Sequence, residues 1–295
     1  MALLYVVGTP IGNLGELSPR ALEALRDCGL VLAEDTRVTR KLLSALQIPG
    51  KRLVSCFQHN EAARAEEIVG RMAAEDLTVC LVTDAGTPCI SDPGYRVVEA
   101  AWAAGIPVQP ISGPSAVVDA ISVSGFSADS YAFFGFLPRQ GREREEAFAR
   151  LAACPTALAV LYESPHRVKR LVADLQEALQ DPMLSLSCDL TKLHEKTIRG
   201  TAEEVLAMLR ANEKAEKGEY CLVLDLHDVH VEEGKAVYDT SLEARIFELL
   251  MAGRDMREAG DALMQQGEKR NDVYRARTAV QKFLEDLWED DDDEE

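Results

Sequence analysis

The segment TDAGTPCISDPG at residues 83–94 constrains the fold more than any other stretch of this chain. It follows the short apolar run Thr78–Val82, which is typical of a strand that is buried on both faces. Its glycines and prolines indicate turns, and ligands in open α/β sheets bind at the carboxyl ends of strands. We therefore expect a parallel sheet with a binding site at the end of this strand.

Two other segments repeat the pattern. GTPIGNL at residues 8–14 follows the apolar run at 3–7, and SGPSA at residues 112–116 follows the run at 108–111. We call residues 8–14, 83–94 and 112–116 the first, second and third glycine–proline turns. Glycine lets the backbone approach a ligand closely and proline fixes the turn, so three such turns at one sheet edge predict a pocket lined by main chain. Each turn taken alone is also consistent with an ordinary connection from strand to helix.

Apolar strand-like runs alternate with amphipathic helical stretches along most of the chain, which predicts an α/β fold class. We expect a parallel N-terminal α/β domain at residues 1–123 and a second α/β domain with a mixed sheet at residues 124–232. A helical appendage at residues 233–285 and an acidic, disordered tail at residues 286–295 complete the prediction.

The composition excludes several classes of protein. The chain of 295 residues is 47% hydrophobic, has no apolar run of membrane-spanning length, and lacks a secretory signal at its start, so we expect a cytoplasmic protein. Seven cysteines without CxxC spacing argue against a disulfide framework and against zinc. His227 and His230 lie three residues apart, but this pattern is weak and we expect no metal.

The net charge of −18 would ordinarily argue against a nucleic-acid partner. Nine of the last eleven residues are acidic, however, and the rest of the chain carries −9. Basic residues still cluster locally, for example at residues 139–144, 167–170 and 269–277. Any binding of RNA must depend on such clusters.

Several familiar catalytic motifs are absent from the sequence. No Rossmann-type glycine fingerprint follows the first strand, and no Walker A, HExxH or GxSxG sequence occurs. P-loop nucleotide hydrolysis, zincin proteolysis and serine-hydrolase chemistry are therefore not expected.

The three glycine–proline turns belong to a longer series of motifs. The others are AEDTR at residues 33–37, HNE at 59–61, GFLPR at 135–139, YESPHR at 162–167, LTKLHE at 190–195 and RGT at 199–201. In this order, and over roughly residues 3–226, the series resembles the RNA-modifying branch of the tetrapyrrole methylase family.

The resemblance implies two α/β domains of the tetrapyrrole methylase type, in a homodimer, with S-adenosylmethionine bound in the cleft between the domains. It also implies methyl transfer to the ribose 2′-oxygen of a cytidine in 16S rRNA, near the decoding centre of the small ribosomal subunit. By the same resemblance, twelve residues are expected to bind the cofactor: Pro10, Ile11, Gly12, Asn13, Asp84, Ala85, Gly86, Ile90, Ser115, Ala116, Tyr162 and Leu190.

Methyl transfer to a hydroxyl oxygen requires alignment of the two reacting atoms and a group that takes the proton. The cleft-facing candidates for this role are Glu34, Asp35, His59, Glu61, Glu163, Lys192, His194 and Glu195. Of these, Glu34, His59, Lys192 and Glu195 are the predicted catalytic residues. The sequence leaves the choice among them open.

Each candidate also has a structural interpretation. Glu34 follows a predicted strand, but the neighbouring Asp35 is equally well explained as a helix cap. His59 either orients the ribose or lies at the start of a helix. Lys192 is a base only if its pKa is lowered near a cationic donor, whereas loop lysines are more commonly exposed charges.

Four arginines are candidates for binding RNA phosphates: Arg37, Arg139, Arg142 and Arg167. Arg139 and Arg142 flank Gly141 in a segment that suits either a lid ordered by RNA or a solvated basic turn. Arg167 begins a predicted helix, where backbone NH groups favour an anion.

Two other functions remain open at this level. The same scaffold methylates tetrapyrroles or diphthine intermediates, although such substrates do not require the arginines around the cleft. A non-enzymatic adaptor that binds RNA or a ribosomal protein through residues 271–283 is the other alternative, and the intact motifs at all three turns argue against it.

Overall fold

The computed structural model describes residues 2–227, 229 and 241–289, with side chains up to residue 284. The chain forms two compact units, residues 1–231 and 232–295, and we describe each separately. The first unit contains two sheets, so the predicted α/β fold class is confirmed. No helix in the described part of the chain is long and apolar enough to cross a membrane.

The first sheet is parallel throughout, with strand order β3-β2-β4-β1-β5. Each strand is a short apolar run, as expected for a sheet covered on both faces. The strands are β1 (Leu3–Val7), β2 (Leu30–Ala33), β3 (Leu53–Ser55), β4 (Thr78–Val82) and β5 (Val108–Ile111).

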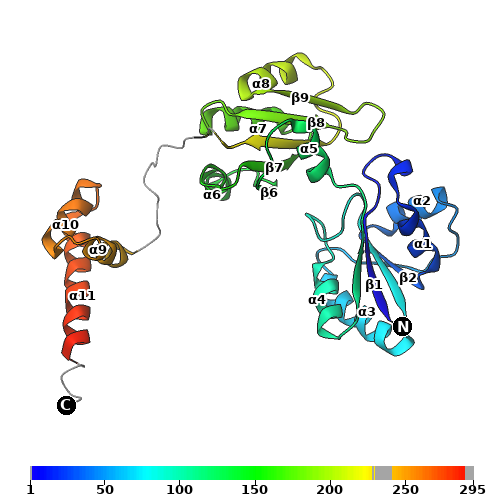
Figure 1. Ribbon diagram of the computed structural model, residues 1–295, viewed down its shortest axis with the longest axis horizontal. Helices are drawn as coiled ribbons and strands as arrows, with labels where there is room; N and C mark the ends of the chain where they lie inside the picture. The colour runs from blue at the N-terminus through cyan, green and yellow to red at the C-terminus, as the bar shows by residue number, and fades with distance from the viewer. Residues whose placement is uncertain (1, 228, 230–240, 290–295) are drawn as a thin grey trace. The chain divides into compact units, whose positions relative to one another are not determined.

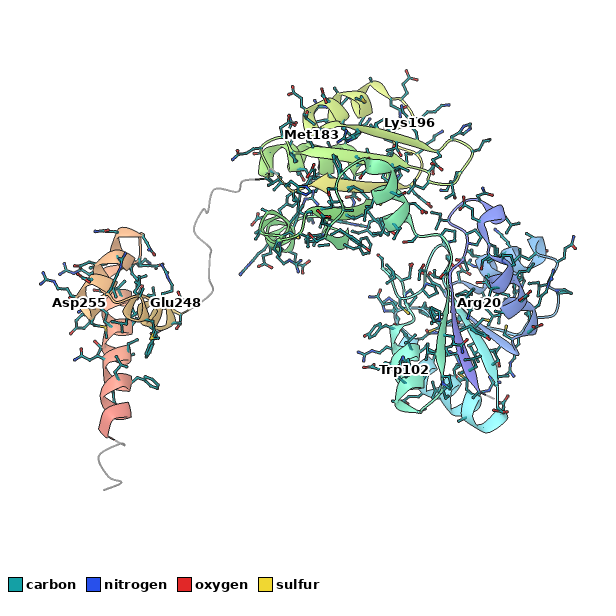
Figure 2. The ribbon with its side chains drawn as sticks, viewed as in Figure 1. Arg20, Trp102, Met183, Lys196, Glu248 and Asp255 are labelled. Carbon is teal, nitrogen blue, oxygen red and sulfur yellow. The ribbon has the colours of Figure 1, made fainter. Side chains whose placement is uncertain are left out.

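Four helices cover the two faces of the first sheet. One apolar cluster includes side chains of α1 and α2, the other includes side chains of α3 and α4, and the two helix pairs lie on opposite sides of the sheet (Figure 1). The helices are α1 (Pro19–Asp27), α2 (Thr36–Ala45), α3 (Glu61–Glu75) and α4 (Tyr95–Ala103). Their outer faces carry exposed side chains such as Arg20 on α1 and Trp102 on α4 (Figure 2).

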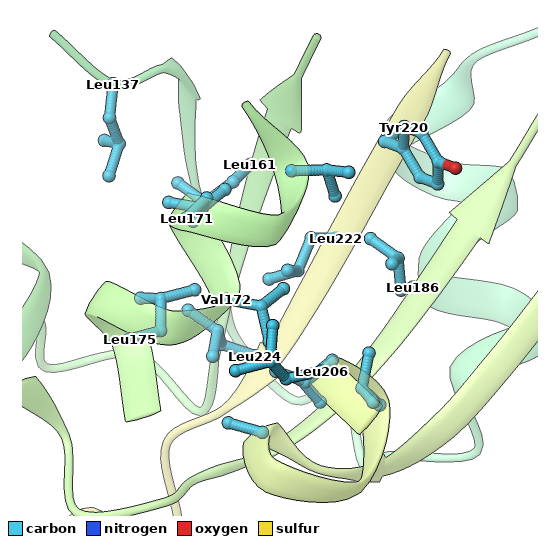
Figure 3. Close-up of a cluster of buried hydrophobic side chains, with 14 of the residues drawn as sticks. Leu137, Leu161, Leu171, Val172, Leu175, Leu186, Leu206, Tyr220, Leu222 and Leu224 are labelled. Atoms are coloured by element: carbon cyan, nitrogen blue, oxygen red, sulfur yellow. The ribbon is translucent and has the colours of Figure 1, made fainter. Parts of the chain in front are cut away.

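The second sheet is mixed, with strand order β6-β7-β10-β8-β9. Strands β6 and β7 pair in parallel, and the other pairs are antiparallel. The strands are β6 (Tyr131–Phe136), β7 (Leu158–Glu163), β8 (Met183–Cys188), β9 (Lys196–Thr201) and β10 (Tyr220–Asp225). One face packs against α6 (Arg142–Ala152), α7 (Val168–Ala178) and α8 (Ala202–Ala211). In Figure 3, Leu222 and Leu224 of β10 face leucines of α7 and α8.

Helix α5 (Ala116–Ser124) covers the opposite face of the second sheet, where Val117 and Ala120 pack with apolar side chains of β7 and β10. In sequence this helix precedes the predicted boundary at residues 123–124, yet in space it belongs to the layers of the second sheet. The chain therefore passes from the first sheet to the second at the third glycine–proline turn. The division of the chain into domains stays a prediction.

Within residues 241–289, the described part of the second unit, three helices surround a small apolar core: α9 (Leu242–Met251), α10 (Met256–Gln265) and α11 (Arg270–Glu289). A capping box, in which Asp255 and Glu258 satisfy each other's backbone NH groups, begins α10. The sequence predicts a disordered tail from residue 286, whereas the backbone at residues 286–289 continues α11. Residues 290–295 and His230 lie outside the described residues.

Candidate active site

Residues from both sheets line a cavity of about 420 Å³ at the carboxyl ends of strands β1, β4 and β5. All three glycine–proline turns contribute to its wall, with Ile11 from the first, Gly86 and Ile90 from the second, and Ser115 from the third. The second sheet contributes residues of β6, β7 and β10. The turns that the sequence places at one sheet edge therefore converge on one cavity.

The first and second turns are joined through backbone hydrogen bonds. The Thr9 NH donates to the Gly86 carbonyl at 2.8 Å, and the Gly86 NH donates to the Thr9 carbonyl at 3.1 Å. The buried Thr9 hydroxyl also donates to the carbonyl of Thr83 at 3.2 Å. Gly86 has a φ of 85°, which favours glycine, so the sequence AG in this turn has a conformational reason.

The first and third turns meet at two glycines. A Cβ on Gly8 would lie 2.8 Å from the Gly113 Cα, and a Cβ on Gly113 would lie equally close to Gly8. Only glycine fits at either position without moving the backbone. This close approach fixes the spacing of the β1 and β5 turns.

The opposite wall of the cavity is apolar and aromatic. Tyr162 of β7 packs edge-to-face against Phe133 at 4.9 Å and against Phe136 at 5.7 Å between ring centroids. Leu190 follows β8, and the backbone around it approaches the first turn so closely that a Cβ on Gly12 would lie 3.2 Å from the Leu190 carbonyl oxygen. The β8–β9 loop therefore closes over the first turn.

Asp92, in the second turn, places a carboxylate in the cavity wall. Burial raises the pKa of Asp92 from 3.8 to about 6; the nearby Glu34 carboxylate acts in the same direction and a hydrogen bond with Thr83 opposes it. Burial likewise raises the pKa of Asp84. The end of β4 thus brings several carboxylates together without a cation in contact with Asp92 among the described residues.

The turn that carries Asp92 is held by a buried carboxylate from α3. Glu61 accepts hydrogen bonds from the Gly94 NH and the Arg96 NH, both at 2.8 Å, at the start of α4. A carboxylate is favourable there because the free NH groups of a helix N-terminus carry partial positive charge. Glu61 is the last residue of the motif HNE, and its position in the structure is that of a helix cap.

The other ionisable groups in the cavity wall have specific contacts. Glu163 accepts from the Ser164 NH at 2.6 Å and from the Arg167 Nε at 2.7 Å. Burial raises the pKa of Tyr162, and it raises the pKa of Cys221 to about 12. These two groups are protonated at neutral pH.

None of the four predicted catalytic residues lines the cavity. Glu34 accepts hydrogen bonds from the Thr83 hydroxyl at 2.5 Å and from the Asp84 NH at 3.3 Å, and these two residues directly precede the wall residue Ala85. His59 is exposed and its ring lies beside Phe57, with 6.3 Å between ring centroids.

The two candidates in the β8–β9 loop are also engaged elsewhere. Glu195 is exposed and accepts from the Thr191 NH at 2.6 Å. Lys192 contacts carboxylate oxygens of Asp189 and Glu219, each at 2.9 Å. Burial alone would lower the pKa of Lys192, but these two carboxylates raise it above its ordinary value. A lysine that acts as a base needs a lowered pKa, and this prediction is wrong for Lys192.

Eight of the twelve predicted cofactor residues line the cavity. Six lie in the glycine–proline turns: Ile11, Ala85, Gly86, Ile90, Ser115 and Ala116. Tyr162 and Leu190 are the other two.

The remaining four predicted cofactor residues lie outside the cavity wall. Pro10 and Gly12 flank Ile11 in the first turn. Asn13 caps a short 3₁₀ turn by accepting from the Gly15 NH, and Asp84 accepts from the Asp35 NH at 3.1 Å.

Sequence reasoning missed part of the wall. Thr87, Ser91 and Asp92 belong to the second turn itself, so that motif contained the signal. Ser164 and Pro165 follow Tyr162 within the motif YESPHR, in which Glu163 was already a candidate proton acceptor. Phe136 lies in the motif GFLPR, so a local signal existed for it as well. Glu219, Tyr220 and Cys221 had no local signal, because only the pairing of β10 with β7 brings them to the cavity.

The predicted RNA-binding arginines differ in availability. Arg37 has a side chain that is 82% exposed and contacts Asp35, whose pKa it lowers to about 2. Arg139 and Arg142 are exposed, and Arg142 pairs with Glu146 on the same helix. Arg167 is directed to the buried Glu163 instead of to solvent.

The comparison with known proteins identifies the scaffold. The model of the Tetrapyrrole (Corrin/Porphyrin) Methylases matches residues 3–206. The chain belongs to this family. Proteins named Ribosomal RNA small subunit methyltransferase I are similar over most of its length. The one from Micromonospora olivasterospora is 39% identical, with 95% of this chain and 88% of that protein covered. The one from Escherichia coli O157:H7 is 36% identical, with 92% and 93% covered.

Solved structures have the same fold. A uroporphyrin-III-C-methyltransferase from Thermus thermophilus is similar with a TM-score of 0.52 and 21% identity, covering 76% of this chain and 94% of that chain. A diphthine synthase has a TM-score of 0.56 and 14% identity, covering 76% and 89%. The predicted tetrapyrrole methylase architecture is confirmed.

The cofactor predicted from the sequence, S-adenosylmethionine, is confirmed by membership of this family. The cavity fits its chemistry. Apolar walls at Ile90 and Leu190 suit a flat adenine ring, and the backbone at Gly86 is open for close approach. The carboxylate of Asp92 suits a ligand that carries a sulfonium and an ammonium charge.

Proposed function

We propose that this chain transfers a methyl group from S-adenosylmethionine to the ribose 2′-oxygen of a cytidine in 16S rRNA, near the decoding centre of the small ribosomal subunit. The observation that carries the proposal is the extent of similarity. Relatives named as small-subunit rRNA methyltransferases match 95% and 92% of this chain, which includes the helical unit as well as the cavity-bearing one.

The cavity supports methyl transfer to a hydroxyl group. S-adenosylmethionine supplies an electrophilic methyl group, so the protein must align the acceptor oxygen and exclude water. The glycine–proline turns are fixed to one another by the Thr9–Gly86 hydrogen bonds and the Gly8–Gly113 contact, and they form a rigid wall for this purpose. Phe136, 56% exposed beside the cavity, offers an aromatic surface on which a nucleobase can stack.

The exposed arginines support an RNA acceptor in spite of the net charge. Arg37 and Arg142 have side chains that are 82% and 89% exposed, and Arg139 is exposed on the loop that precedes Arg142. Phosphates compete well for such surface arginines, because exposed ion pairs within the protein are weak. We expect binding to rRNA that weakens steeply as salt concentration rises. Arg167 is the exception, since it pairs with Glu163.

We further propose that the protein acts in the cytoplasm and as a homodimer, as the resemblance to the family implies. Sedimentation of the purified protein at micromolar concentration measures its oligomeric state. A monomer under these conditions contradicts that part of the proposal.

The function is tested by mapping ribose methylation on 16S rRNA from cells with and without this protein. We expect one cytidine 2′-O-methyl group to disappear in its absence and to return with the intact gene. The variant Ile90→Trp fills the cavity and is expected not to restore the mark. Val123→Trp is the matched control, because Val123 is 51% exposed against 47% for Ile90 and lies outside the cavity wall. A mark that is unaffected by loss of the protein refutes the proposal.

Removal of residues 232–295 distinguishes an enzyme from an adaptor. The cavity lies entirely within the first unit, so we expect the shortened chain to retain binding of S-adenosylmethionine in calorimetry. If the protein is an adaptor that acts only through its helices, we expect no binding of S-adenosylmethionine in the same measurement.

A further inference from the structure

None of the four predicted catalytic residues lines the cavity, and the cavity wall contains another candidate for the proton acceptor of this reaction. The wall carries two carboxylates that are contacted by cations, Glu163 by Arg167 and Glu219 by Lys192. Asp92 differs, because no ion pair joins it to a cation within the described part of the chain.

The remaining ionisable side chains in the wall are poor proton acceptors at neutral pH. The pKa values of Tyr162 and Tyr220 are raised by burial, and burial raises that of Cys221 to about 12, so all three hold their protons. The Tyr220 hydroxyl also donates to the Ala215 carbonyl at 2.9 Å. The carboxylate of Glu163 is occupied by Arg167 and the Ser164 NH.

The position of Asp92 is fixed. It lies in a turn bounded by Ser91 with a φ of 65° and Gly94 with a φ of 133°, two left-handed conformations that hold the turn in one shape. Glu61 anchors the end of this turn through the NH groups of Gly94 and Arg96. A base on such a support stays in one place relative to the cavity.

We propose that Asp92 is the general base that accepts the proton of the acceptor hydroxyl during methyl transfer. The inference rests on the proposed function. As the acceptor oxygen forms its bond to the methyl carbon, the O–H bond breaks and the proton passes to a carboxylate oxygen of Asp92. The bond between sulfur and the methyl carbon breaks and its electron pair stays on sulfur, which leaves S-adenosylhomocysteine. Asp92 then loses the proton to water.

The electrostatic surroundings of Asp92 suit this role. Its pKa of about 6 leaves it mostly ionised at pH 7 and makes it more basic than an ordinary aspartate. The charges that face it are the carboxylates of Glu34 and Asp84, which raise the pKa, and a hydrogen bond with Thr83 opposes them. Cys89 and Tyr162 are within electrostatic range and are uncharged at this pH.

The variant Asp92→Asn tests the proposal, with Asp119→Asn as the control. Asp119 also has a pKa raised by burial, but it lies on α5 outside the cavity wall. With the full-length protein and small-subunit rRNA, we expect Asp92→Asn to lower kcat by about 10²–10⁴-fold. We also expect the fall in kcat/KM of the wild type below pH about 6 to disappear in this variant, while Asp119→Asn keeps the wild-type profile.

A second readout does not depend on turnover. Calorimetry at pH 6 in buffers of different ionisation enthalpy counts the protons released when a ligand binds. S-adenosylmethionine, with its positive sulfonium, should displace up to about half a proton from wild-type Asp92, and neutral-sulfur S-adenosylhomocysteine should displace fewer. Asp92→Asn should bind both ligands with no such difference.

The outcomes separate the two proposals. If the wild type methylates no ribose in rRNA, the proposed function fails whatever Asp92 does. If the wild type does methylate ribose, two results overturn the assignment of Asp92. One is a kcat of Asp92→Asn equal to that of the wild type, and the other is a kcat/KM of Asp92→Asn that still falls below pH 6.

Discussion

A base held partly buried in a cavity wall should destabilise the folded protein, and Asp92 allows this effect to be measured. In the folded protein its pKa is about 6, against an ordinary value of 3.8. A raised pKa means that the folded state binds the proton more tightly than the unfolded state. The stabilisation from this protonation is complete below pH about 4 and is lost as pH rises through about 6. Above pH 7 the ionised carboxylate remains in the wall, and no cation among the described residues forms an ion pair with it.

The size of the effect follows from the shift. A difference of about two pKa units corresponds to about 3 kcal/mol at 1.36 kcal/mol per unit, and screening by solvent in the open cavity reduces this to about 1–2 kcal/mol. Asp92→Asn removes the charge and keeps the shape of the side chain. We therefore expect this variant to unfold with a free energy about 1–2 kcal/mol higher than the wild type at pH 7.5, and with no such gain at pH 4.

Hydrogen exchange of the β4 amides, Thr78–Val82, is a suitable assay, because these buried residues lie in the same unit as Asp92 and immediately precede its turn. Their slowest exchange reports the free energy of unfolding of that unit separately from the helical one. A gain of equal size at both pH values, or a loss of stability at pH 7.5, would show that the charge of Asp92 does not destabilise the fold.

Three other substitutions test the surroundings of the cavity. Gly12→Val should lower the affinity for S-adenosylmethionine at least about tenfold in calorimetry, since its side chain would press on the β8–β9 loop; unchanged affinity contradicts this. Glu61→Ala leaves two NH groups of α4 without their acceptor and should lower the free energy of unfolding by about 2–3 kcal/mol in urea titrations, where a change below about 0.5 kcal/mol would refute the capping role. Lys192→Met should lower kcat by less than about tenfold and leave the fall in activity below pH 6 unchanged, because the raised pKa of Lys192 keeps it protonated; a loss of 10²-fold or more would restore it as a base.

The backbone of the cavity could be predicted from the sequence. Strand-like runs that end in glycine and proline predict turns at one edge of a parallel sheet, and the Gly8–Gly113 contact and the Thr9–Gly86 bridge form there. These features depend on backbone conformation and on the lack of a side chain, which the residue type determines locally. The strand order that brings the second sheet against the turns is set by long-range pairing, which no local pattern reveals.

The ionisable groups could not be assigned in the same way. Glu34 and Asp92 both lie near the end of β4, but only Asp92 reaches the cavity wall. Lys192 lies in the motif LTKLHE, and the lowered pKa expected of a base was wrong because Glu219, distant in sequence, raises the pKa of this lysine. A pKa depends on burial and on neighbouring charges from other elements, and both are properties of the tertiary structure.

The same arrangement explains why the base should be an aspartate in the second turn and not one of the residues beside it. Glu34 is hydrogen-bonded to the Thr83 hydroxyl and the Asp84 NH and does not line the cavity, so it is not placed to contact an acceptor bound there. Asp92 is partly removed from water and faces two carboxylates, so accepting a proton relieves both unfavourable interactions. Keeping Asp92 ionised costs the folded protein free energy, and transfer of a proton from the acceptor to Asp92 releases it. Removal of this charge should therefore raise the free energy of unfolding and lower the activity.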